Sequence, residues 1–183
     1  MDRPLVDDFV TEYGRYRAIG ERALAQMSDA ALNHVPAPDG NSAAMIVRHL
    51  GGNLASRFTD FLTSDGEKPW RDRDAEFATR AYGRAEVDEW WARGWGVLEG
   101  ALAGLTDADL GRAVVIRGQP LTVHAALARS LAHVAHHVGQ LVLLAREAAE
   151  GPWRWISIPK GGSAEYNAAP TKERGLGEPT RGA

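Results

Sequence analysis

The chain has 183 residues, enough for one domain with a substantial core, and its 44% hydrophobic and 25% charged residues exclude a disordered or fibrous protein. The formal net charge of −3 provides no basic face for nucleic acid, and no apolar run is long enough to span a membrane. The N-terminus, MDRPLVDDFV, carries acids where a secretory signal carries bases. We therefore expect a cytoplasmic protein that binds neither nucleic acid nor membrane.

Four segments place apolar residues three and four positions apart, the spacing of amphipathic helices. They are residues 5–27, 41–62, 86–105 and 122–149. Asn41 and Ser42 are good helix-capping residues at the start of the second segment. Four helices of this length, joined by one long crossover and shorter turns, predict an all-α fold, the four-helix bundle.

The connections between these helices carry further information. The polar, charged stretch TSDGEKPWRDRD follows the second helix, and long loops of this kind in compact domains are more often functional than idle. Residues 113–121 contain VVI and a Gly-Gln-Pro turn, which indicates a small hairpin. We expect the bundle domain with an extended C-terminal segment over residues 1–165, and a Gly/Pro-rich tail over 166–183.

Three of the six histidines lie in the run LAHVAHHVGQ of the fourth helix. His133 and His137 stand at positions i and i+4, about 40° apart around the axis and about 6 Å apart along it, so two imidazoles can converge on one ion. His136 is the alternative partner, but its side of the helix also carries Arg129 and Glu147, which indicates a solvated face. We therefore favour the His133–His137 pair.

The second helix supplies a third histidine, on a polar row beside its apolar stripe. His49 and Asn53 belong to this row, and the chain has no cysteine to bind a metal instead. Histidines at 49, 133 and 137 would give three ligands and leave an open position, the pattern of a catalytic metal site. The alternative interpretation is a set of hydrogen-bonded core histidines. We expect His34 and His124 to be structural or surface residues.

Polar residues near these histidines are candidates for supporting roles. Asn53 and Gln140 lie one helical turn beyond a predicted ligand, where each is placed to orient a bound water or substrate or to make a structural hydrogen bond. Arg57 and Asp60 are candidates for the mouth of a pocket, with an ordinary solvated helix end as the alternative.

The tryptophans and one glycine pair also need an interpretation. Trp91 and Trp95 have helical spacing and are predicted to lie in the core, while Trp153 and Trp155 alternate as in an extended segment that covers the bundle.

The run KGGS, Lys160–Ser163, is expected to be a turn, because it lacks the pattern GxxxxGK[ST] of a phosphate loop. The alternative is an anion cradle formed by its backbone amides.

A histidine in the second helix followed by His-x-x-x-His in the fourth resembles the DinB/YfiT-like superfamily. The segments NSAAMIVRHLGGNLASRFTDFLTSDGEKPW and LAHVAHHVGQLVLLAREAAEGPWRWISIPKGGS resemble one uncharacterised branch of it. The resemblance covers most of residues 5–165. It implies metal ligands at His49, His133 and His137, a divalent ion such as Zn²⁺ or Ni²⁺, and a homodimer. Characterised members of the superfamily join low-molecular-weight thiols such as bacillithiol or mycothiol to electrophiles, or isomerise maleylpyruvate.

The leading hypothesis is a metal-dependent transferase that activates a low-molecular-weight thiol as the nucleophile toward a small-molecule substrate. One alternative is a hydrolase that uses the same ion to activate a water molecule. Another is a metal-binding, stress-associated protein without turnover. The three histidines serve all three hypotheses equally well.

Overall fold

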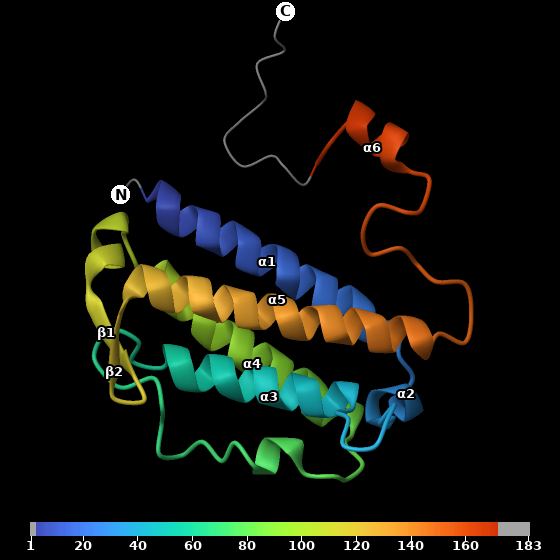
Figure 1. The fold of residues 1–183 in the computed structure, drawn as a ribbon, viewed down its shortest axis with the longest axis horizontal. Coiled ribbons are helices and arrows are strands. Elements are labelled where there is room, and N and C mark those ends of the chain that lie inside the picture. Colours follow the sequence, from blue (N-terminus) through green and yellow to red (C-terminus); the bar gives the residue numbers. More distant parts are fainter. Residues whose placement is uncertain (1–2, 172–183) are drawn as a thin grey trace, which may run out of the picture.

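Four long helices pack side by side along one direction in the computed structural model, which describes residues 3–171 (Figure 1). They are α1 (Pro4–Leu24), α3 (Ala43–Phe58), α4 (Arg84–Ala103) and α5 (Val123–Glu147). The main packing contacts join α3 to α4, α1 to α5 and α3 to α5. The all-α bundle predicted from the apolar spacing is therefore confirmed. No helix within the described range is both long and apolar enough to cross a membrane.

Short elements close the two ends of the bundle. The five-residue α2 (Asp29–Asn33) begins after Ser28, whose hydroxyl accepts a hydrogen bond from the backbone N–H of Ala31. A 3-10 helix, η2 (Asp107–Gly111), precedes the strands β1 (Ala113–Ile116) and β2 (Gln119–Thr122).

These strands form an antiparallel hairpin in which Ala113 pairs with Thr122. The turn between them is Arg117–Gly118, and both residues have positive φ, 56° and 71°, as two-residue hairpin turns require. The predicted Gly-Gln-Pro turn was wrong in this detail, because Gln119 and Pro120 already belong to β2.

All four predicted helix ends were too late in the sequence, by two residues for α4 and α5 and by more for α1 and α3. The second helix ends at Phe58 rather than near Leu62, because Thr59 turns extended (φ −64°, ψ 126°) and Asp60 adopts a left-handed conformation with φ 49°. The first helix ends at Leu24 rather than Met27. In both cases the apolar pattern continues past the helix end, since residues in the following turn also pack on the core.

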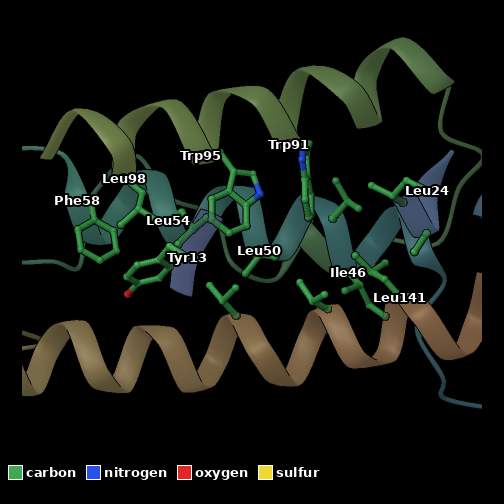
Figure 2. Close-up of a cluster of buried hydrophobic side chains, with 14 of the residues drawn as sticks. Tyr13, Leu24, Ile46, Leu50, Leu54, Phe58, Trp91, Trp95, Leu98 and Leu141 are labelled. Carbon is green, nitrogen blue, oxygen red and sulfur yellow. The ribbon is translucent and has the colours of Figure 1, made fainter. Parts of the chain in front are cut away.

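The core lies between the helices and is rich in aromatic side chains. Figure 2 shows Trp91, Trp95 and Leu98 of α4 pointing toward Leu50 and Leu54 of α3. Trp95 is 1% exposed and Trp91 6%, so their predicted core positions are confirmed.

Two glycines let α3 and α4 approach each other more closely than side chains would allow. A Cβ atom on Gly94 would lie 2.6 Å from the Cα of Gly51. The same approach leaves no room for a side chain at Gly51, where a Cβ atom would collide with the backbone carbonyl of Trp90. The two helices are therefore in direct backbone contact at this crossing.

The long connection from residue 59 to residue 83 runs along the outer side of α3, away from α1 (Figure 1). It contains one turn of 3-10 helix, η1 (Ala75–Phe77). The carboxylate of Asp65 ties it to the hairpin by accepting hydrogen bonds from the N–H groups of Arg117 and Gly118, both at 2.8 Å. This loop thus has fixed contacts on both α3 and the hairpin.

The C-terminal segment crosses to the other side of the bundle and ends in the short helix α6 (Ser163–Ala168). Arg154 is held to the end of α1 by backbone hydrogen bonds with the side chain of Gln26. Trp153 packs against the core as predicted, whereas Trp155 is 42% exposed and stacks with Arg146. The boundary between a domain at 1–165 and a tail at 166–183 stays a prediction, since residues 172–183 lie outside the described range.

Candidate metal centre

Three histidines from two helices meet between α3 and α5. His49 of α3 and His133 of α5 face each other through their Nε2 atoms at 3.2 Å. His137, one turn further along α5, places its Nε2 atom 3.1 Å from that of His133. One ligand atom from each of the three rings lies within 4.8 Å of those of the other two. The structure therefore brings together the three residues singled out in the sequence.

The spacing of these nitrogens matches what one ion requires. Zinc binds histidine nitrogen at about 2.0–2.1 Å in tetrahedral geometry, which places neighbouring ligand nitrogens about 3.3 Å apart. The two shorter separations, 3.1 and 3.2 Å, are close to that value. The three rings could therefore close around one cation with small adjustments.

The hydrogen bonds behind two of the rings support the same conclusion. His49 donates from Nδ1 to a carboxylate oxygen of Glu76 at 2.8 Å, and His137 donates from Nδ1 to the amide oxygen of Gln140 at 2.8 Å. These hydrogen bonds use the Nδ1 atoms and leave the Nε2 atoms of both rings facing His133. A cation held between the three Nε2 atoms would satisfy all of them.

Burial keeps the rings of the α5 histidines neutral. It is the largest cause that lowers the pKa of His133 to about 3, with further lowering from the nearby His137, His49 and Arg71. Burial also lowers the pKa of His137 to about 4, against the opposing hydrogen bond with Gln140. Their lone pairs are therefore available to a metal ion at neutral pH.

Glu76 is the most important residue of the site that the sequence did not reveal. It lies on η1 with its side chain 6% exposed, and it accepts from His49 on one side and from Arg71 on the other. Arg71 binds both carboxylate oxygens, at 2.8 and 2.9 Å. Burial raises the pKa of Glu76, but the hydrogen bonds from His49 and Arg71 outweigh it, and the net shift is downward. Glu76 is therefore an ionised partner of the His49 ring.

A carboxylate that holds the far nitrogen of a ligand histidine is a recurring feature of metal sites, because it fixes the tautomer and raises the basicity of the ring. Gly52 of α3 makes room for this one, since a Cβ atom there would collide with the Oε1 atom of Glu76. The only sequence signal for Glu76 was the length and polarity of its loop. Nothing distinguished it from the other charged residues there.

The other predicted residues fall into two groups. Gln140 contacts His137, and Asn53 and Arg57 line a cavity beside the histidines. Asp60 is exposed and does not line that cavity, so its expected place at the pocket mouth was wrong. His136 is exposed, which confirms its solvated face.

The remaining two histidines are also on the surface. His34 is exposed in the loop that follows α2. His124 is exposed near the start of α5 and packs edge-on against Phe9 at 5.7 Å between ring centroids.

The cavity has a volume of about 360 Å³ and opens beside the candidate ligands His49 and His133. Helices α3 and α5, the long loop and the β-hairpin all contribute to its walls. The KGGS segment does not, because Figure 1 places α6 and the chain before it on the α1 side of the bundle, away from the long loop. The KGGS segment therefore does not fold over the metal cleft.

The bundle architecture and the histidine cluster define an all-α protein with a candidate metal centre. It is similar to the crystal structure of a DinB-like protein from Bacillus cereus ATCC 10987, with 19% sequence identity and a TM-score of 0.58. The match covers 80% of this chain and 97% of that one. At this identity the likeness shows the fold alone, and it confirms the resemblance at that level.

The chain belongs to the family described as "Protein of unknown function (DUF1572)", which matches residues 1–162. No curated protein matches the sequence.

Proposed function

We propose that this protein binds one divalent metal ion, Zn²⁺ or Ni²⁺, through His49, His133 and His137. The observation that carries the proposal is the convergence of three Nε2 atoms at separations of 3.1 and 3.2 Å, with Glu76 and Gln140 holding two of the rings from behind. Neutral nitrogen ligands suit both ions.

We further propose that the protein is a transferase acting with a low-molecular-weight thiol. A divalent ion held by three neutral ligands would supply the charge that lowers the pKa of a thiol and stabilises its thiolate. The chain itself has no cysteine that would compete for this position. Asn53, in the cavity wall, is placed to orient the thiol or its electrophile by hydrogen bonding.

The lining of the cavity favours this reaction over the hydrolytic alternative. Metal-dependent hydrolases commonly use a carboxylate as the general base for water, as the Glu of the HExxH motif does. Among the described residues that line this cavity there is no Asp or Glu. Glu76, the nearest buried carboxylate, is already engaged with His49 and Arg71. A thiol that ionises near neutral pH has less need of such a base.

The first test is the metal content of protein purified without chelators, measured by elemental analysis for the wild type and two variants. We expect one ion per chain in the wild type and in His136→Ala, and loss of the ion in His137→Ala. His136 is a matched control, because it is the exposed neighbour of His137 on the same helix. A wild-type protein with less than stoichiometric metal, which also takes up none on addition, would overturn the proposal.

The second test is consumption of thiol by the metal-loaded protein with a panel of alkyl and aryl halide electrophiles. We expect turnover with at least one thiol, loss of turnover in His137→Ala and retention in His136→Ala. Turnover of ester or amide substrates without thiol would instead establish the hydrolase. A metal-loaded protein without turnover in either screen would support the non-catalytic alternative.

We also propose that the protein acts on a small molecule and forms a homodimer, as the superfamily resemblance implies. Light scattering coupled to size-exclusion chromatography measures the mass directly. A particle of twice the chain mass of 19.8 kDa is the expected result, and a monomer at micromolar concentration would contradict it.

A further inference from the structure

The cavity beside the histidines is lined by an unusual number of arginines. Five guanidinium groups contribute to its wall, and they come from α3, the long loop, the hairpin turn and α5: Arg57, Arg71, Arg73, Arg117 and Arg129. Residues this far apart in the sequence converge on one space only through the fold. The formal net charge of the whole chain is −3, so the cluster is a local feature against an overall negative charge.

Two carboxylates neutralise part of this charge. Glu67 binds both Arg57 and Arg117, at 3.2 and 2.7 Å, and Glu76 binds Arg71. Neither acid lines the cavity itself. Within residues 3–171, no ion pair joins Arg73 or Arg129 to a carboxylate, so the five guanidinium groups exceed their two acidic partners by three positive charges.

The two unpaired arginines are accessible and stand on different walls. Arg73 belongs to the loop and lies over the ring of Phe77 at 5.2 Å, and Phe77 in turn packs on His49 with ring centroids 4.8 Å apart. Arg129 is exposed on α5, one turn before His133. An anion held between these two side chains would therefore lie next to two of the three candidate metal ligands.

A third guanidinium group has spare hydrogen-bonding capacity. The Arg71 side chain is 2% exposed, and its Nη1 atom has no hydrogen-bond partner among the described residues although Nε and Nη2 both bind Glu76. Buried N–H groups without partners are costly, and a ligand oxygen would relieve that cost. Crowding of like charge is also evident at Arg57, where burial together with Arg71 and Arg117 outweighs Glu67 and lowers the pKa.

We propose that this cavity is an oxyanion subsite, and that the small molecule processed at the histidines is an organic anion whose carboxylate or phosphate is held by Arg73 and Arg129. Planar guanidinium groups recognise both oxyanions through paired, charge-assisted hydrogen bonds. The anion would be anchored at the arginines with its uncharged part directed toward His49 and His133. The reaction of this anion at the histidines rests on the proposed function. The binding of the anion by the arginines does not depend on it.

The test measures anion binding separately from metal binding. Metal-free protein is titrated by calorimetry with succinate, inorganic phosphate and the uncharged analogue succinamide, because without an ion any binding reports the arginines alone. We expect succinate or phosphate to bind, with an affinity that falls as salt is added, and succinamide not to bind. Tighter binding of succinate than of phosphate would identify a carboxylate as the preferred oxyanion, and the reverse order would identify a phosphate.

Substitutions then locate the subsite. Arg73→Gln combined with Arg129→Gln is expected to weaken anion binding at least tenfold, while Arg22→Gln, which removes the same charge from an exposed position on α1, leaves it unchanged. Zinc affinity, measured by competition with a chromophoric chelator, should survive in all of these variants.

Two outcomes would overturn the subsite. They are the absence of any anion binding by the wild type, and an undiminished affinity in the double variant. Either can occur with zinc binding intact, whereas failure of the metal proposal would leave anion binding in place.

Discussion

Removing the charge of Glu76 tests the role of the residue that the structure adds to the site. The change Glu76→Gln keeps the size of the side chain but replaces a carboxylate that accepts from His49 and Arg71 with a neutral amide. Loss of such a partner behind a ligand histidine typically weakens metal binding about 10–100-fold, equivalent to about 1.4–2.7 kcal/mol. We expect the zinc affinity of this variant to fall by that factor.

The assay is competition for zinc against a chromophoric chelator at fixed pH and salt, with Glu67→Gln as the matched control. Like Glu76, Glu67 is a carboxylate in ion pairs with the arginines of this region, but its partners are Arg57 and Arg117 and no histidine. An unchanged zinc affinity in Glu76→Gln, or an equal loss in both variants, would refute the reasoning, because the effect would then be absent or due to general electrostatics.

Stability gives an independent view of the same residue. Removing one member of a buried ion pair costs about 3–5 kcal/mol, since the other charge is left without its partner, and the Arg71 side chain is only 2% exposed. Replacing both members by apolar residues of similar volume is often neutral or stabilising. The double variant Arg71→Met, Glu76→Leu should therefore lose less stability in urea than either single variant, with a remaining loss from the buried His49 N–H left without an acceptor, and should bind zinc weakly.

Two further predictions concern the packing of the long loop. Gly52→Ala should lower both zinc affinity and thermal stability, because the added Cβ collides with the Glu76 carboxylate, whereas Gly96→Ala, at an open site on α4, should not lower either. Asp65→Asn should destabilise the loop, measured by proteolysis of the 59–83 segment. Backbone N–H groups lower the pKa of Asp65, so the stability it contributes is present above its unfolded pKa of about 3.9 and is lost as the pH falls through the folded value. The stability of the loop in Asp65→Asn should therefore not show this decrease as the pH falls.

The fold could be predicted because its main determinant is local in the sequence. Apolar residues at helical spacing mark each long helix, and the capping hydroxyl of Ser42 accepts from the N–H of Met45 as its position before the helix implies. Helix ends were less accurate. The side chains of Met27 and Phe61 are buried although they lie beyond their helices, so burial alone did not mark the end of helical geometry.

The histidine cluster could be predicted in part for the same reason. His133 and His137 are related by helical geometry, and His49 lies on a polar row beside an apolar stripe. Glu76 and Arg71 could not be found this way. Their buried partnership depends on how a loop without periodic structure folds back onto α3 at Gly52, which no local pattern in the sequence records.

The proximity of the arginines to the histidines has a consequence for how the two sites act together. A divalent ion placed among neutral ligands adds positive charge beside a cavity that already holds an excess of guanidinium groups. Without an anion these charges repel each other, and a bound anion lies between them and attracts both. Metal and anion should therefore bind with positive cooperativity, and linkage requires that each raise the affinity of the other by the same factor. Zinc affinity measured with and without succinate, and succinate affinity measured with and without zinc, must give one common ratio above unity. A ratio of unity would mean that the two sites are electrostatically independent, and the cavity would then lie too far from the ion to hold its substrate.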